Sequence, residues 1–194
     1  NEVFNIIKSK FKNTDKEKIC GISGDLINME TLYIFKEFFN KTLGSYNIES
    51  RSDHTYLNPD KRENYLFSSS IKGIEESDFI FLIGSNPRYE ATILNARIRK
   101  SYLQNKTKII SLNDVGDLTY PYEALDGSIE NIKNITEDKH KISKLIKEAK
   151  KPLIIFGQSA LKISSAKYLF ESIKSFLKKN NKISKEWNSL NVIS

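Results

Sequence analysis

Cysteine is almost absent from this sequence of 194 residues, which contains only Cys20. One thiol cannot form an internal disulfide bond, so the chain is not a small disulfide-stabilised domain. His54 and His140 are the only histidines, and no spacing typical of a zinc or iron–sulfur site joins them to the cysteine. No apolar run approaches the roughly 20 residues that cross a bilayer. We therefore expect neither a metal site nor a direct membrane span.

Arginine and alanine are also scarce, with 5 Arg and 6 Ala against 26 Lys, 26 Ile and 18 Asn. Lysine, isoleucine and asparagine all have A/T-rich codons, so an A/T-rich genome accounts for the net charge of +7. A basic surface for a partner is the alternative interpretation. A nucleic-acid interface would be rich in arginine with interleaved aromatic residues. Here the aromatic residues fall on apolar stripes, so we expect no nucleic-acid partner.

Apolar mass is plentiful, because 39% of the residues are hydrophobic and 11 Phe and 9 Tyr are present. This content excludes a disordered chain and supports one medium-sized core. Short β-rich runs alternate with helical patterns. Four such runs predict strands, at residues 18–23, 78–83, 108–112 and 153–157. Strands that alternate with helices predict an α/β fold, with a parallel sheet covered by helices on both faces.

The expected helices carry apolar residues at helical spacing. A helix over about 28–40, with Asn28 as its N-cap, is predicted to be well buried. Further helices are predicted from near Glu90 to Tyr102 and over 142–149. The last helix, over 166–177, is expected to be amphipathic, with Lys162, Lys167, Lys174 and Lys178 on its outer side.

One long segment of the chain shows neither a helical nor a strand pattern. Residues 44–70 are polar and too long for a tight connection, so we expect an irregular excursion with a short helix around 63–67.

Cys20 lies in the middle of the first predicted strand and is expected to be a small buried hydrophobe. Asp53 beside His54 suggests a base and its orienting partner, but no elbow-type turn places a nucleophile, so we expect no hydrolase.

Ligands of open α/β sheets bind at the carboxyl ends of the strands. After the second predicted strand the chain reads Gly84, Ser85, Asn86 and Pro87, and glycine or small polar residues also follow the other strands. A turn that cradles phosphate needs such residues. None of these turns matches a complete G-x-G-x-x-G or P-loop, and ordinary strand-to-helix turns also explain the glycines. A nucleotide site built by this chain alone therefore stays only an alternative.

Three of the five arginines, Arg88, Arg97 and Arg99, lie within twelve residues that follow this turn. Glu90 opens the helix there, where the helix dipole favours a carboxylate. Arginine makes planar, bidentate hydrogen bonds that lysine cannot make. We predict that these residues form structural ion pairs within the domain or contacts with another subunit; a bound anion is the third possibility.

Residues around this cluster resemble the large iron–sulfur subunits of respiratory complex I, the NADH:ubiquinone oxidoreductase. The longest matching stretch contains GSNPRYEATILNARIRKSYL. The matching stretches together are residues 22–32, 63–103, 117–128, 148–161 and 186–194. The resemblance implies that residues 1–194 are part of one α/β domain, Rossmann-like and built as in the molybdopterin oxidoreductases, with 44–70 as the irregular excursion.

The resemblance also implies a function. In molybdopterin enzymes, loops of the GSNP kind hold a pterin dinucleotide, whereas the domain in the complex I branch is structural and lacks the cofactor. The loop from Gly84 to Pro87 is then vestigial, and we expect this chain to hold no cofactor and no catalytic residue. The family binds its iron–sulfur clusters in an N-terminal region that this sequence does not contain.

The expected partners are other peripheral-arm subunits of complex I. The expected location is the matrix side of the mitochondrial inner membrane or, alternatively, the cytoplasmic side of a bacterial inner membrane. Two other functions stay open at this point. One is a fragment of an active molybdopterin-dependent oxidoreductase, and the other is a free-standing nucleotide-binding protein.

Overall fold

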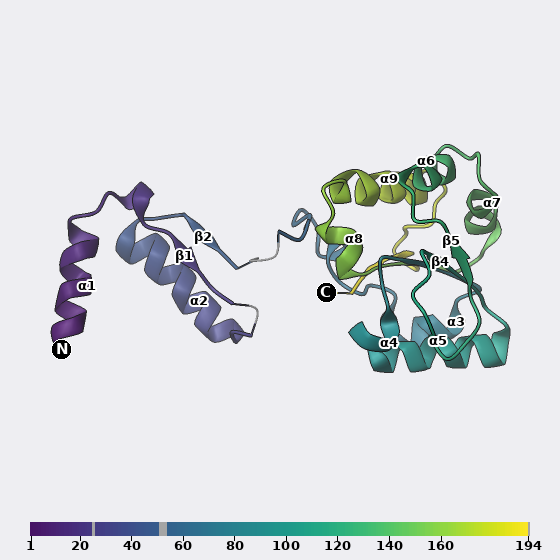
Figure 1. The fold of residues 1–194 in the computed structure, drawn as a ribbon, viewed down its shortest axis with the longest axis horizontal. Helices are drawn as coiled ribbons and strands as arrows, with labels where there is room; N and C mark the ends of the chain where they lie inside the picture. Colours follow the sequence, from purple (N-terminus) through teal and green to yellow (C-terminus); the bar gives the residue numbers. More distant parts are fainter. Residues whose placement is uncertain (25, 51–53, 194) are drawn as a thin grey trace. The chain divides into compact units, whose positions relative to one another are not determined.

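A computed structural model describes residues 1–24, 26–50 and 54–193 (Figure 1). The chain divides into two compact units, Asn1–His54 and Thr55–Ser194. They are described separately below, and the expectation that residues 1–194 are part of one domain stays a prediction. No helix within the described ranges has both the length and the apolar character that crossing a membrane requires.

The second unit is built on a five-stranded sheet with the strand order β5-β4-β3-β6-β7. Its strands are β3 (Phe79–Ile83), β4 (Lys108–Leu112), β5 (Glu123–Leu125), β6 (Pro152–Phe156) and β7 (Leu190–Val192). Every pair of neighbours is parallel. The central strands β3 and β6 are buried along their whole length, as their continuous apolar sequences predict.

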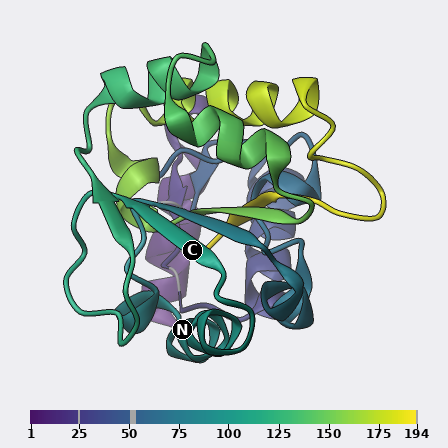
Figure 2. The same ribbon diagram turned by 90° about the vertical axis from the view of Figure 1, so that its right-hand side faces the viewer.

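Helices cover both faces of this sheet (Figure 2). Their bounds are α3 (Ser70–Glu76), α4 (Pro87–Glu90), α5 (Thr92–Asn105), α6 (Ile129–Thr136), α7 (Lys141–Glu148), α8 (Gln158–Lys162) and α9 (Ala166–Lys179). Successive side chains of β3 point to opposite faces. Phe79, Phe81 and Ile83 belong to a core cluster with α6, α7, α8 and α9, whereas Ile80 and Leu82 pack with α3 and α5. The predicted α/β fold is confirmed for this unit.

Several local predictions for the second unit need correction. The strands β5 and β7 and the helix α6 were not expected, although Ser128 caps α6 and Ile132 and Ile135 are fully buried. Lys174, expected on the outer side of the last helix, is only 7% exposed, and its ammonium lies over the Phe170 ring. Its long aliphatic stem packs on the apolar face of α9.

The first unit is small. It contains α1 (Glu2–Lys12), a 3₁₀ turn η1 (Lys16–Lys18), β1 (Gly21–Ile22), α2 (Met29–Glu37), a π-helical segment η2 (Phe38–Leu43) and β2 (Ile48–Glu49). β1 pairs in parallel with β2 in a two-stranded sheet. The prediction that residues 18–23 form a strand of the main sheet is therefore wrong, because only two of them have strand geometry and β2 is their partner.

Burial in the first unit also differs from expectation. Asn28 caps α2 as predicted, since its side-chain oxygen accepts a hydrogen bond from the Thr31 backbone N–H at 2.8 Å. No residue of α2 is buried, however, because its apolar stripe faces a sheet of only two strands. Cys20 precedes β1 and is exposed, so the expectation of a buried mid-strand thiol is wrong.

The segment 44–70 has little regular structure in its described residues. β2 lies near its beginning, and a 3₁₀ turn, η3 (Arg62–Asn64), stands near the place where a short helix was expected. Phe67 also forms an isolated antiparallel bridge with Asn191. These contacts attach the end of the segment to β7.

Candidate functional site

The carboxyl ends of β3, β4 and β6 converge at one edge of the five-stranded sheet, where the chain continues through Gly84, Asn113 and Gly157. A cavity of about 300 Å³ lies at this edge. Its walls are formed by Ile83, Gly84, Leu112, Asn113, Gly127, Ile129, Ile132, Ser159, Ala160, Ile163, Ser165 and Leu169. This edge is where the sequence predicts a site.

Two glycines let the ends of β3 and β6 approach each other closely. Gly84 has a left-handed backbone with a φ of 56°, and a Cβ atom at this position would clash with Ala160. A Cβ atom at Gly157 would clash with the Gly84 carbonyl and with Ser85. The Ser159 hydroxyl donates a hydrogen bond to the Gly84 carbonyl at 2.5 Å. The first turn of α8 therefore closes the crevice between these two strands.

Charge is missing from the cavity walls. Among the described residues that line the cavity, there is no lysine, arginine, aspartate or glutamate, and most side chains are aliphatic. Ser85 and Ser111 each have a buried hydroxyl without a hydrogen-bond partner in the described part of the chain, but neither lines the cavity. The side chains of the cavity walls thus suit a small, mostly apolar molecule, and those described supply no cation for a phosphate group.

Asn86 connects the turn after β3 to the loop after β4. Its side-chain oxygen accepts a hydrogen bond from the Arg88 backbone N–H at 3.2 Å, which caps α4, and Pro87 occupies the first helical position. Its amide nitrogen donates to the Val115 carbonyl at 2.8 Å. The Glu90 carboxylate accepts from the Asn86 backbone N–H at 2.6 Å. One asparagine therefore fixes the helix start and the neighbouring loop together.

Arg88 strengthens the same connection. Its guanidinium donates to the backbone carbonyl of Asp117 at 2.8 Å and to its carboxylate at 2.6 Å. The pKa of Asp117 lies below its usual range because the Thr119 backbone N–H and then Arg88 donate hydrogen bonds to the carboxylate. Both side chains are substantially exposed, so the pair contributes more to loop geometry than to stability.

The other two arginines also have partners within the chain. Arg97 on α5 forms an ion pair with Glu75 on α3, and Lys100 contacts the second oxygen of that carboxylate at 2.7 Å. Hydrogen bonds from Lys100 and then Arg97 lower the pKa of Glu75. Arg99 donates to the Thr119 carbonyl at 3.3 Å. A contact between these arginines and another subunit stays a prediction.

The loop after β4 contains a second group that sequence patterns did not indicate. The Tyr122 hydroxyl lies 2.6 Å from the Asp114 carboxylate and accepts a hydrogen bond from the Val115 backbone N–H at 3.0 Å. Hydrogen bonds from Tyr122 and then from the Gly116 backbone lower the pKa of Asp114. Burial and then the nearby Asp114 carboxylate raise the pKa of Tyr122. The group holds the loop in shape.

The other candidate residues that the structure describes form no site. In the described ranges, no cluster of three or more His, Cys, Asp or Glu side chains is arranged to hold a metal ion. His140 is the N-cap of α7, where its Nδ1 accepts a hydrogen bond from the Ile142 backbone N–H at 3.3 Å. His54 is exposed, and Asp53, its suggested partner, lies outside the described residues.

Comparison with known proteins gives consistent matches. A family model described as molybdopterin oxidoreductase matches residues 1–194. The chain is 34% identical to the NADH-ubiquinone oxidoreductase 75 kDa subunit of Reclinomonas americana, over 97% of this chain. It is 33% identical to the mitochondrial NADH dehydrogenase (ubiquinone) iron-sulfur protein 1 of Solanum tuberosum, over 91% of this chain.

A bacterial relative also matches. It is a subunit of the NADH-quinone oxidoreductase of Rickettsia prowazekii and is 30% identical over 99% of this chain. The matched region covers 29%, 24% and 28% of these three relatives, respectively. The chain therefore spans less than a third of the length of these three relatives.

Proposed function

Since this chain belongs to the molybdopterin oxidoreductase family, we propose that it is a structural, cofactor-free domain of the large iron–sulfur subunit of respiratory complex I. Relatives named as NADH-ubiquinone or NADH-quinone oxidoreductase subunits, similar over nearly the whole chain, support this assignment. In this role the domain supports electron transfer from NADH to ubiquinone without taking part in the chemistry.

The observation that carries the cofactor-free proposal is the closed, uncharged edge of the sheet. A pterin dinucleotide contains a pyrophosphate, which proteins bind with backbone N–H groups at helix starts or with cationic side chains. Here the Ser159 hydroxyl already donates its hydrogen bond to the Gly84 carbonyl, and the described residues around the cavity provide no cationic side chain. The residues at this edge do not fit the cofactor, so no reaction step is assigned to it.

We propose that the loops at this edge of the sheet have a structural role. Asn86 and Arg88 fix the loop after β4 through hydrogen bonds to Val115 and Asp117. A loop positioned by a rigid sheet presents a defined surface to its neighbours. We infer that the partners are other peripheral-arm subunits, on the matrix side of a mitochondrial inner membrane or the cytoplasmic side of a bacterial one.

The test uses the native assembly that contains this chain. Membranes of the source organism are solubilised gently, and complexes are separated by native electrophoresis. An antibody to this chain is expected to detect a band with NADH:ubiquinone oxidoreductase activity. Elemental analysis of that band is expected to find iron but no molybdenum at the level of the chain.

Three results would contradict the proposal in different ways. If the antibody detects the chain only in bands without NADH:ubiquinone oxidoreductase activity, the assignment to complex I is wrong. Molybdenum in a stoichiometric amount in the band would instead indicate a working molybdopterin-dependent oxidoreductase. Tight nucleotide binding by the purified chain would favour a free-standing nucleotide-binding protein.

A further inference from the structure

The first unit has a groove that the proposed function does not use. Helix α1 carries Phe4, Ile7 and Phe11 at the spacing i, i+3 and i+7, which places them along one side of the helix. Phe4 is 75% exposed and Ile7 is 42% exposed. Large apolar side chains that stay this open on one side of a helix mark a surface for a partner.

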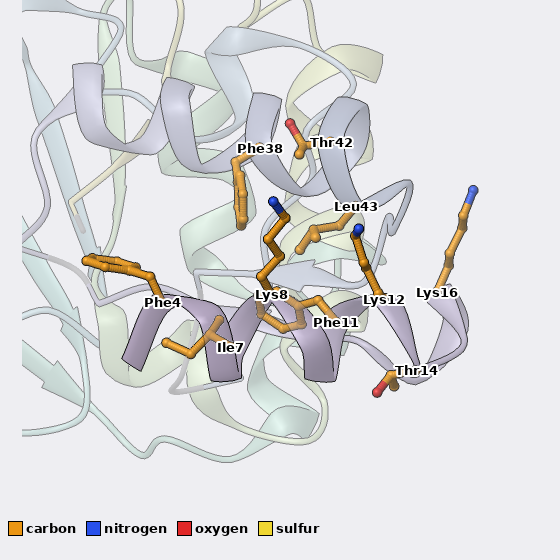
Figure 3. Close-up of a pocket in the computed structure, with 10 residues that line it drawn as sticks. All are labelled: Phe4, Ile7, Lys8, Phe11, Lys12, Thr14, Lys16, Phe38, Thr42 and Leu43. Atoms are coloured by element: carbon orange, nitrogen blue, oxygen red, sulfur yellow. The ribbon is translucent and has the colours of Figure 1, made fainter. Parts of the chain in front are cut away.

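A second wall faces this helix side. Phe38, Thr42 and Leu43 of η2 line the same cavity as Phe4, Ile7 and Phe11, and the cavity volume is about 530 Å³ (Figure 3). Phe38 is itself 42% exposed. Both walls belong to the first compact unit, so no described residue of the second unit lines the groove. Its length follows α1, whose 11 residues extend for about 16 Å.

The charged side chains that line the groove are all positive. Lys8, Lys12 and Lys16 line it, and no carboxylate is among the described residues that do so. Across residues 1–24, 26–50 and 54–193, none of these three ammonium groups has an ion-pair partner. Lys41 and Lys18 nearby in sequence do have such partners, Glu37 and Asp15. The groove thus combines apolar anchoring positions with unpaired positive charge.

We propose that this groove binds an acidic amphipathic helix of another polypeptide. An amphipathic helix places anchors at i, i+3 or i+4 and i+7 in an apolar groove, and about three turns match the length of α1. Its carboxylates lie beside Lys8, Lys12 and Lys16. Opposite charges at the edge of such a contact speed association and exclude wrong partners.

Two other occupants fit the groove less well. A second copy of this chain carries the same lysines and a net charge of +7, so the two surfaces repel each other. A helix that lies in a membrane surface keeps its apolar side outward and its lysines on the opposite, polar side. Here two apolar walls share one groove, and lysines line that same groove.

The experiment measures binding of a fluorescent synthetic helix to the full 194-residue chain. The probe has Leu at the anchoring positions of about four turns and Glu at the outer positions, and its fluorescence anisotropy reports binding. We expect the double variant Lys8→Glu/Lys12→Glu to weaken the affinity about tenfold or more, because two attractive charges become repulsive ones. Phe4→Ser is expected to weaken it to a similar extent through the lost anchor.

Matched controls lie on α9 and the loop after it. Lys167→Glu/Lys185→Glu makes the same change in net charge at exposed positions, and Tyr168→Ser removes an exposed aromatic ring. Both are expected to leave the affinity unchanged within about twofold, well below one tenfold step. Circular dichroism checks that every variant folds. Added salt is expected to weaken binding to the unmodified chain.

Several results would overturn the proposal. Equal loss of affinity in the Lys8→Glu/Lys12→Glu and Lys167→Glu/Lys185→Glu variants would mean nonspecific attraction to a basic protein. If a probe with Lys in place of Glu binds equally well, the charge of the groove has no role in binding. If the chain does not bind the probe but forms dimers, and Phe4→Ser abolishes these dimers, the occupant of the groove is a second copy of the chain. Binding to phosphatidylglycerol vesicles but not to the probe would identify a membrane surface. None of these results bears on the assignment to complex I.

Discussion

Gly84 occupies the point at which the ends of β3 and β6 come together. Replacement by alanine has two costs: the left-handed backbone with a φ of 56° and the clash of the new Cβ with Ala160. We expect Gly84→Ala to destabilise the second unit by about 3 kcal/mol or more. The only tryptophan, Trp187, lies in this unit and donates to the Pro152 carbonyl at 3.0 Å, so its fluorescence during urea unfolding reports the change.

Gly116 provides the matched control, since its φ is 78° and no other group lies within 4 Å of the point that a Cβ atom would occupy. Gly116→Ala has only the backbone cost, and we expect a loss of about 1 to 2 kcal/mol. The difference between the two variants measures the close approach of the strands. Equal losses would show that the edge of the sheet is not closed as described.

The position of the candidate site was predictable from single residues, but its contacts were not. The Asn-Pro pair after an apolar run predicts a helix start at a strand end, and Asn86 and Pro87 form one. Asp114 followed by Gly116 is typical of a local turn. Tyr122 meets Asp114 only after the loop folds back, and Ser159 of α8 meets Gly84 although 75 positions separate them in sequence. No local pattern encodes such distant contacts.

The elements with long, regular apolar patterns were predicted well, whereas the short strands and the helices α1, α3, α6 and α8 were not. β3 and β6 have continuous apolar sequences, and α9 has a regular apolar stripe. β5 and β7 have only three residues each, too few to show a period of two. β1 has two residues, and its neighbours in space could not be read from its sequence.

The pair α3 and α5 is held in part by Glu75, which contacts both Arg97 and Lys100. The pKa of Glu75 is lower in the folded chain than in the unfolded one, because hydrogen bonds from Lys100 and Arg97 favour its charged form. Its contribution to stability is therefore present above the unfolded pKa, about 4.3 for glutamate, and is lost as the pH falls through the folded pKa.

We accordingly expect Glu75→Gln to be less stable than the unmodified chain near neutral pH and to lose less stability on acidification. Urea unfolding at a series of pH values, followed by Trp187 fluorescence, measures both effects. Glu130→Gln is the control, since Glu130 is exposed and has no ion-pair partner among the residues described. Parallel pH curves for Glu75→Gln and the unmodified chain would contradict the role of the carboxylate.

At the scale of the whole molecule, burial is distributed very unequally between the two units. Both hydrophobic core clusters consist of residues from Tyr56 onward. In residues 1–24, 26–50 and 54 the buried hydrophobic side chains are Ile19 and Phe39. The family model nevertheless matches the whole chain, so the first unit is a regular part of the family's sequence.

Because nearly all of the buried apolar surface lies in the second unit, we expect that unit to fold without the first. A chain of residues 55–194 retains both core clusters and every strand of the five-stranded sheet. Its Trp187 unfolding transition in urea is expected to keep the midpoint and slope of the full chain, because the slope follows the surface exposed on unfolding. Residues 1–54 alone bury too little apolar surface to offset the entropy of folding, and we expect no cooperative transition from them. A large drop in midpoint for residues 55–194 would instead mean that the first unit contributes directly to the stability of the sheet.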